Sequence, residues 1–199
     1  MTRIFTAEEI ARNAPAAASR KTGSVHVCPL SEVPNLVAEV QACRLVSLLQ
    51  AEIPVATPKG ITPARHLRLE VHDIAEPILD HVAPDMTHVR KLIGFAEKWG
   101  GEGAMVVHCW AGISRSTAAA FTALCLVNPD VPELVIARAL RAASPTAQPN
   151  RLIVQLADDL MGRKGRMLGA VEAMGPAMRA YAAKPFSLSA DPVMLAKAR

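Results

Sequence analysis

The sequence predicts one α/β domain with a central, mostly parallel sheet of about four to five strands and helices on both faces, a three-layer α/β/α arrangement. Short apolar segments typical of strands alternate with helical segments through the first half of the chain, and helical segments follow. The 199 residues are 51% hydrophobic and 20% charged, a composition sufficient for one full core.

Four segments have the length and the apolar or alternating pattern of strands. They are residues 25–28, 44–50, 66–71 and 104–107. Residues 51–63 contain three prolines and a glycine and are expected to form a loop. Because parallel strands need crossover connections, helices are expected between the strands.

Six segments carry helical spacing and helix boundary signals. They are residues 33–40, 88–99, 116–127, 131–143, 152–161 and 167–182. Ser31 is the expected N-cap of the first helix, and Asp85 or Thr87 that of the second, which Gly100 ends.

We divide the chain into an N-terminal extension (1–23), a main domain (24–183) and a C-terminal tail (184–199). Residues 6–9 match a capping box, so a short helix is expected in the extension. The tail is expected to be irregular from Lys184 onward.

Charge and cysteine content restrict the kind of protein. The net charge of +4 fits an anionic ligand, although an ordinary solvated surface often has this excess. No Cys-x-x-Cys pair or zinc-type Cys/His spacing is present, so Cys28, Cys43 and Cys125 are expected to be small core residues in a reducing compartment. With neither a signal-like nor a membrane-spanning apolar segment, we expect a cytoplasmic protein.

The stretch from Ala104 to Ala120 predicts an anion site. It passes from an apolar strand through a loop over Cys109–Ser114 into a helix of small residues. Successive N–H groups of such a loop and the positive N-terminus of the helix attract phosphate. Gly112 tolerates the unusual backbone angles required, and Arg115 offers a planar fork of donors to two phosphate oxygens.

The same positive field favours the thiolate form of a cysteine, so Cys109 is expected to be an anionic nucleophile. Ser116 is placed to donate its hydroxyl to the sulfur and to help it leave a covalent intermediate. His108 is not expected to act as its base, because adjacent strand residues point to opposite faces. A role in supporting the loop backbone is favoured for His108. Trp110 is a candidate for the pocket wall.

Residues 107–116, Val-His-Cys-Trp-Ala-Gly-Ile-Ser-Arg-Ser, resemble the phosphate-binding loop of the cysteine-based protein tyrosine and dual-specificity phosphatases. The signature of that superfamily is His-Cys, five residues, then Arg-Ser or Arg-Thr. The wider pattern of residues 118–120, 141–145 and 149–150 is similar to that of a small bacterial branch. The resemblance covers roughly residues 24 to 165.

The resemblance implies a dual-specificity-phosphatase-like fold and a phosphomonoester hydrolase that works through a phosphocysteine on Cys109. It implies that the loop positions bind phosphate together with Arg115: Trp110, Ala111, Gly112, Ile113 and Ser114. No metal or cofactor is implied. The expected partner is a phosphorylated protein, with phosphotyrosine as the first choice, or a small phosphomonoester. Neither nucleic acid nor a membrane is expected as a partner, and the lack of lysine within the loop argues against phosphoinositides.

The resemblance also implies an aspartate upstream of the cysteine as general acid. Asp73 is the best candidate, because it follows the third expected strand, 36 residues before Cys109, and parallel strands bring their carboxyl ends together. Asp80, Asp85 and Glu76 are rivals, and His72 is a weaker one. The Trp-Pro-Asp triplet of the larger tyrosine phosphatases is absent from the sequence.

Other groups have ordinary explanations. Gln148 is a candidate to position water, but Pro145 and Pro149 more simply fix a helix–helix connection that also holds Arg141, Ser144 and Asn150. The basic residues in 163–166 are expected to form a solvated helix start. The methionines of 161–178 are expected to pack in the core.

Two functions from other classes stay open. A sulfur-transfer or arsenate-reductase-type enzyme uses a cysteine in a similar anion loop without an acid of the Asp73 kind. A catalytically weak phosphate- or phosphoprotein-binding module would need the loop but not the nucleophile.

Overall fold

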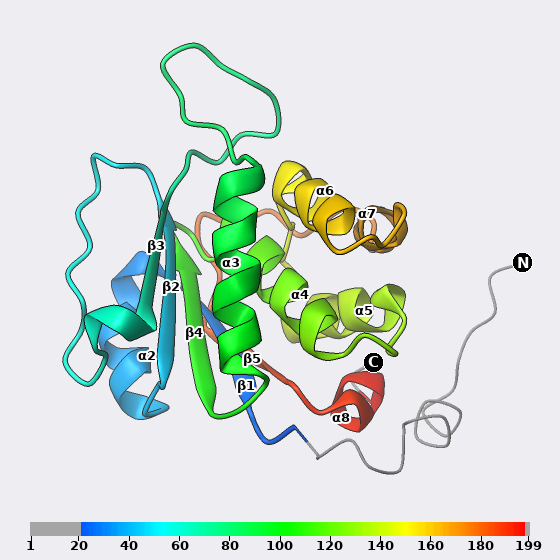
Figure 1. The fold of residues 1–199 in the computed structure, drawn as a ribbon, viewed down its shortest axis with the longest axis horizontal. Coiled ribbons are helices and arrows are strands. Elements are labelled where there is room, and N and C mark those ends of the chain that lie inside the picture. Colours follow the sequence, from blue (N-terminus) through cyan, green and yellow to red (C-terminus); the bar gives the residue numbers. More distant parts are fainter. Residues whose placement is uncertain (1–20, 198–199) are drawn as a thin grey trace, which may run out of the picture.

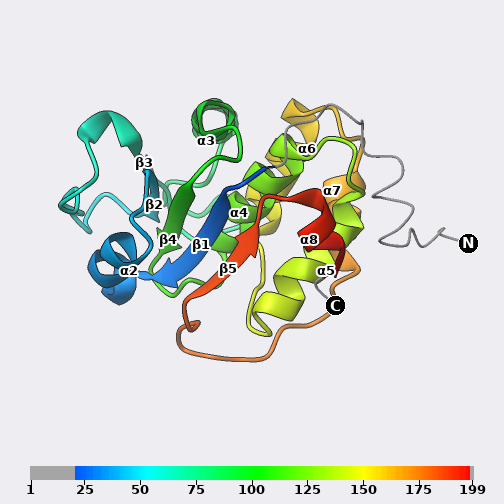
Figure 2. The same ribbon diagram turned by 90° about the horizontal axis from the view of Figure 1, so that it is seen from below.

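The computed structural model describes residues 21–197 and contains a five-stranded sheet in the order β3-β2-β4-β1-β5. The strands are β1 (Ser24–Pro29), β2 (Arg44–Leu49), β3 (His66–Glu70), β4 (Ala104–Cys109) and β5 (Phe186–Ser189). The first four are parallel, and β5 pairs with β1 in the antiparallel direction. Figure 2 shows them side by side. The mostly parallel sheet predicted from the sequence is confirmed.

Helices cover both faces of the sheet, which confirms the three layers (Figure 1). One face carries α2 (Val33–Glu39). The helices α3 (Met86–Trp99), α4 (Arg115–Val127), α5 (Glu133–Ala143), α6 (Arg151–Leu160) and α7 (Arg166–Glu172) lie on the other side. Short 3-10 turns, Leu30–Glu32 and Pro63–Arg65, precede α2 and β3.

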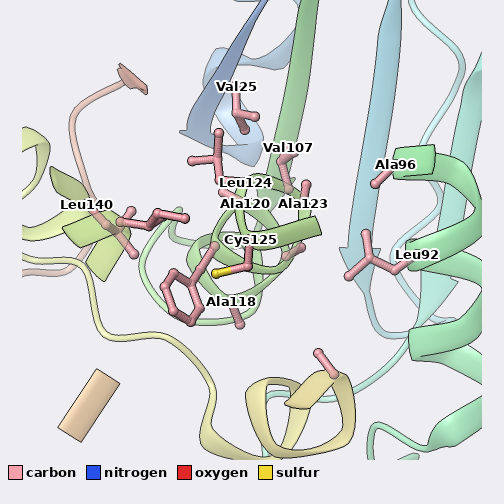
Figure 3. Packing of buried hydrophobic residues seen from close by; sticks show 14 of the residues in the cluster. Val25, Leu92, Ala96, Val107, Ala118, Ala120, Ala123, Leu124, Cys125 and Leu140 are labelled. Carbon is pink, nitrogen blue, oxygen red and sulfur yellow. The ribbon is translucent and has the colours of Figure 1, made fainter. Parts of the chain in front are cut away.

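The helix α4 is the centre of the larger core. All of its residues except Leu126 are buried, and it contacts α3, α5, α6 and three strands. Figure 3 shows its alanines, with Leu124 and Cys125, enclosed by the surrounding elements. The small side chains allow this close approach, because packed interiors leave little space for larger ones. A second cluster under α2 joins Leu36 and Val37 to Leu45 and Val106.

Helix boundaries follow local chemistry in most places. The Asp85 carboxylate accepts hydrogen bonds from the Thr87 and His88 amides and so caps α3, as expected. Gly100 ends this helix in the left-handed conformation. The expected cap at Ser31 was wrong, since α2 begins after Glu32 without a side-chain cap.

Two predictions for the C-terminal third were also wrong. The helix expected over 167–182 ends at Glu172, because Gly175 has a φ of 68° and Pro176 cannot continue a helix. The expected irregular segment from Lys184 onward instead forms β5 and α8 (Pro192–Lys197). Hydrogen bonding to the edge strand β1 supplies the order that the local sequence does not indicate.

The basic cluster at 163–166 is not simply a solvated helix start. The Arg163 guanidinium is largely buried, lies 3.0 Å from the Glu133 carboxylate and donates to the Cys125 carbonyl. It therefore joins α5 to the segment before α7. Of the methionines expected in the core, Met167 is fully buried, whereas Met178 is exposed.

The helix expected near Thr6 lies outside the described residues. Within residues 21–197, no helix combines the length and the apolar character needed to cross a membrane. The carboxyl ends of the parallel strands meet at one edge of the sheet, and this edge carries the loop that begins at Cys109.

Candidate active site

Strand β4 ends at Cys109, and α4 begins at Arg115. The predicted order of strand, loop and helix N-terminus is therefore present, with the loop between β1 on one side and the segment after β3 on the other. The loop backbone is fixed by its carbonyls, which accept hydrogen bonds from the Leu30, Ala183, Gln148 and Asn150 amides.

Most of the loop carbonyls thus point toward neighbouring segments. The loop amides make no such contacts. Within residues 21–197, none of the N–H groups of residues 110–114 donates a hydrogen bond to the protein. Residues 111–114 are buried or partly buried, and amides of such residues need an acceptor. Together with the N-terminus of α4 they form a cradle for an anion.

Gly112 makes the turn of this loop possible. Its φ is +72°, and a Cβ at this position would lie 2.8 Å from both the Cys28 carbonyl carbon and the Pro29 nitrogen. Any other residue would be strained by its backbone angles and would also push the loop away from β1.

Cys109 and Ser116 are in contact. The Cys109 side chain is 1% exposed, and its Sγ lies 3.1 Å from the Ser116 Oγ at the first turn of α4. A hydroxyl at this distance can donate to a thiolate. The thiols of Cys28 and Cys125 are buried, and burial raises the pKa of Cys28 to about 12 and that of Cys125 well above its usual value.

Arg115 is oriented by the backbone of a neighbouring strand end. Its side chain is almost completely buried, and Nη1 donates to the Val71 carbonyl at 2.8 Å. The Nε atom is buried and has no hydrogen-bond partner among the described residues. It lies 3.7 Å from the Asp73 carboxylate. A buried guanidinium donor without an acceptor is costly unless a ligand supplies one.

His108 supports the loop and does not approach the thiol. Its ring lies on the α2 face, where Nε2 is 2.6 Å from the Ser47 Oγ and Nδ1 is 3.4 Å from the Cys109 carbonyl oxygen. Burial lowers the pKa of His108 to about 4, so the ring is neutral at pH 7. This placement is the one that strand alternation predicts.

Asp73 lies against the loop, in the position the sequence indicated. One carboxylate oxygen accepts hydrogen bonds from the Ser114 hydroxyl at 2.6 Å and from the Asn150 side-chain amide at 3.0 Å. The other oxygen faces the Arg115 Nε. Asp73 is therefore in contact with both the loop and α6, and its role as general acid stays a prediction.

The rivals of Asp73 lie elsewhere. The Asp85 carboxylate is occupied as the cap of α3, and the backbone hydrogen bond from His88 lowers the pKa of Asp85. Asp80 and Glu76 are exposed on the long loop between β3 and α3, at the top of Figure 1. The His72 ring accepts a hydrogen bond from the Val82 amide and packs edge-on against His81.

Two cavities meet at Asp73. One, of about 450 Å³, lies over the loop and is lined by Asp73, Trp110, Ala111, Arg115 and the two histidines. The other, of about 580 Å³, extends past Ser114 and Gln148 toward α7. Cys109 does not line the first cavity.

Sequence reasoning missed three contributions to this site. The Val71 carbonyl orients Arg115, Ser47 contacts His108, and Asn150 contacts Asp73. Asn150 is also the N-cap of α6, with its side-chain oxygen accepting from the Ile153 amide. A capping asparagine leaves its NH2 group free for a second contact, and that is the one local signal that was available.

Comparison with solved structures identifies the architecture. The structure of DUSP15 matches with a TM-score of 0.55 at 21% identity, over 77% of this chain and 95% of that chain. PTPMT1 matches with a TM-score of 0.50 at 22% identity, over 71% and 94%.

The fold is that of the dual-specificity phosphatases. No family model and no curated protein sequence matches the chain. The chain is thus similar to these phosphatases in fold, at low sequence identity. In residues 21–197, no three His, Cys, Asp or Glu side chains gather as a metal site would require.

We expect Gly112→Ala to distort the anion cradle, because a Cβ would meet the Cys28 backbone at 2.8 Å. Binding of inorganic phosphate or vanadate, measured by calorimetry, should weaken by about tenfold or more. Gly169→Ala is the matched control, because that glycine is in α7 with open space around its Cβ position. Equal phosphate affinity in both variants would contradict the proposed geometry of the loop.

Proposed function

We propose that this protein is a cysteine-dependent phosphatase of the tyrosine or dual-specificity type, which hydrolyses phosphomonoesters through a phosphocysteine on Cys109. The observation that carries the proposal is the buried Arg115 Nε, which has no acceptor among the described residues. It lies beside the loop that follows Cys109, whose N–H groups donate no hydrogen bond to the described protein. A tetrahedral dianion satisfies all of these donors, and the dual-specificity-phosphatase fold supports the assignment.

In the first step, Cys109 Sγ attacks phosphorus, and the bond to the leaving oxygen breaks. Arg115 and the loop amides hold the three equatorial oxygens, whose negative charge is spread out in the transition state. Asp73 donates a proton to the leaving oxygen.

In the second step, water attacks the phosphocysteine. Asp73, now a carboxylate, accepts a proton from the water, and inorganic phosphate leaves. Ser116 stabilises the departing thiolate through its hydroxyl at 3.1 Å. Catalysis therefore depends on positioning and on fixed dipoles.

Exposed apolar side chains on the loop after β3 and beside Trp110 favour a substrate whose phosphate is carried on an apolar or aromatic group. Leu79 and Tyr181 are 86% and 87% exposed, and Ile78, Val82 and Trp110 are about half exposed. Trp110 and Tyr181 line one small cavity beside the loop. Exposed apolar groups gathered at one place commonly mark a binding surface. A phosphotyrosyl protein is therefore the substrate class we favour.

The alternatives have distinct outcomes in the same assay. A phosphate-binding module would bind phosphate without turnover. A sulfur transferase or arsenate reductase would act on thiosulfate or arsenate and would not depend on Asp73. The bound anion is similar in all three cases, so only turnover separates them.

The direct test is hydrolysis of p-nitrophenyl phosphate by the wild type and by Cys109→Ser. We expect turnover to be lost in the variant while phosphate binding persists, because the amides and Arg115 remain. A rapid acid quench of the wild type should trap phosphate on Cys109, detected by mass spectrometry. Cys43→Ser, at the other end of the sheet, should retain full activity. Tight phosphate binding without turnover in the wild type would favour the binding module.

Asp73→Asn should slow turnover in a manner that depends on the leaving group. With an alkyl phosphate, whose leaving oxygen needs a proton, kcat should fall on the order of 100-fold, whereas p-nitrophenyl phosphate should be affected much less. Asp80→Asn, further along the same loop, serves as the control. Unchanged kcat of Asp73→Asn on the alkyl phosphate would exclude Asp73 as the acid.

Leu79→Ser tests the apolar surface. For a phosphotyrosyl peptide KM should rise by about three- to tenfold, from the partial loss of one buried leucine contact, with kcat little changed. For p-nitrophenyl phosphate, which does not extend to this loop, both constants should stay the same. Met194→Ser is the comparison variant, because Met194 is another exposed apolar residue and lies in α8. Equal KM values for the peptide in both variants would rule out this surface.

A further inference from the structure

Three buried polar side chains lie side by side on the α2 face of the sheet, on three adjacent strands. His66 of β3, Ser47 of β2 and His108 of β4 are each at most 6% exposed. The Ser47 Oγ lies 2.8 Å from the His66 Nε2 and 2.6 Å from the His108 Nε2. A buried polar group is expensive unless it is fully hydrogen-bonded, so this cluster requires an explanation.

Both ends of the cluster continue to further groups. At one end the His108 Nδ1 lies 3.4 Å from the Cys109 carbonyl oxygen. At the other end the His66 Nδ1 lies 3.1 Å from the Thr57 Oγ1, which accepts a hydrogen bond from Arg68 Nη2 at 2.6 Å. The line therefore runs from an exposed arginine on the edge strand to the backbone of the proposed nucleophile.

Both imidazoles in the line are neutral at physiological pH. Burial lowers the pKa of His66 and of His108 to about 4 in each case. The positive charges of Arg68 and Arg115, respectively, act in the same direction. A neutral imidazole has one donor nitrogen and one acceptor nitrogen. The role of one nitrogen of each ring therefore determines the role of the other, and so the donor–acceptor order along the line.

The Cys109 carbonyl sets that direction, because it can only accept. His108 must then carry its proton on Nδ1, which leaves Nε2 as an acceptor. Ser47 must donate its single hydroxyl proton to His108 Nε2. The Ser47 oxygen then accepts from His66, which must carry its proton on Nε2.

The other end closes consistently. With its proton on Nε2, His66 presents Nδ1 as an acceptor, so the Thr57 hydroxyl donates to it. The Thr57 oxygen accepts from Arg68, a side chain that can only donate. Every group in the line has one assigned role, and none of its buried side-chain nitrogen or oxygen atoms is left without a partner.

We propose that Arg68, Thr57, His66, Ser47 and His108 form one directional hydrogen-bond relay that positions the Cys109–Trp110 peptide of the anion loop. The benefit to catalysis rests on the function proposed above. The relay acts on the backbone, because His108 and the Cys109 thiol lie on opposite faces of the sheet. Cys109 belongs to the larger core cluster, whereas the cluster under α2 lies on the face of His108. These five are positioning residues.

The consequence for the anion site follows from peptide geometry. No cis peptide occurs in the described chain, so the carbonyl of Cys109 and the N–H of Trp110 point in opposite directions. Holding the carbonyl toward His108 therefore directs the Trp110 N–H away from the relay. This N–H is one of the amides of the anion cradle that donate no hydrogen bond to the described protein.

The first test is the tautomer of each histidine in the wild-type protein, read from long-range proton–nitrogen spectra with labelled histidine at pH 7. The relay requires the Nε2-protonated form for His66 and the Nδ1-protonated form for His108. A reversed or mixed tautomer at either ring would overturn the proposal, whether or not the protein hydrolyses any phosphate.

The second test removes the central hydroxyl. In Ser47→Ala, the His108 tautomer should become mixed, and both kcat/KM for p-nitrophenyl phosphate and the affinity for inorganic phosphate should fall by about three- to tenfold. Ser47→Thr restores a hydroxyl and should recover the tautomer and the affinity. Ser24→Ala is the matched control, because it removes a serine–histidine contact of 2.8 Å in the neighbouring strand β1 that lies outside the relay.

Thr57→Val gives an independent variant if Ser47→Ala does not fold, since Thr57 is in a loop and only partly buried. It should make the His66 tautomer mixed and weaken phosphate binding to a smaller extent than Ser47→Ala. A lower melting temperature with native tautomers and phosphate affinity in both variants would show a purely structural cluster and would contradict the relay. Native tautomers without any hydrolysis by the wild type would instead contradict the proposed function alone.

Discussion

The orientation of the backbone in residues 110–114 is the constraint on which the rest of the site depends. Four of its five carbonyls accept a hydrogen bond from another segment, whereas none of its amides donates to the described protein, so the amides are free to face an anion. The four partner amides come from three segments: the 3-10 turn after β1, the connection before α6 and the chain before β5. These segments are brought together only by the complete fold. A local sequence can specify the glycine of the turn, but the direction of the other peptides is a property of the tertiary structure.

The packing around α4 explains why the loop can be this rigid. The helix is buried on nearly all sides, and its N-terminal turn carries both Arg115 and Ser116. A helix enclosed by three other helices and the sheet has little freedom to shift along its axis. Its positive N-terminus is therefore fixed relative to Cys109, which belongs to the central part of the sheet. Preorganised dipoles of this kind do not have to reorient during the reaction.

The sequence predicted the elements whose signals are local and missed those that depend on distant pairing. The strands β1 to β4 and the cap at Asp85 were found because apolar patterns and capping residues lie within them. The strand β5 has only four residues, and its order comes from β1, more than 150 positions away. The loop from Cys109 to Arg115 was found from its own spacing. The contacts around it have no signature of their own: Val71 with Arg115, Ser47 with His108 and Asn150 with Asp73.

Charge balance shows why a neutral relay suits the other face of β4. In the proposed reaction a dianionic phosphate brings about two negative charges to the loop, and Arg115 supplies one positive charge. The remainder has to be met by the N-terminus of α4 and by the free loop amides. A charged histidine at position 108 would add to this field, but its burial opposes that state. A neutral His108 can instead fix the direction of a peptide dipole, so the site obtains its positive potential from geometry that does not titrate near neutral pH.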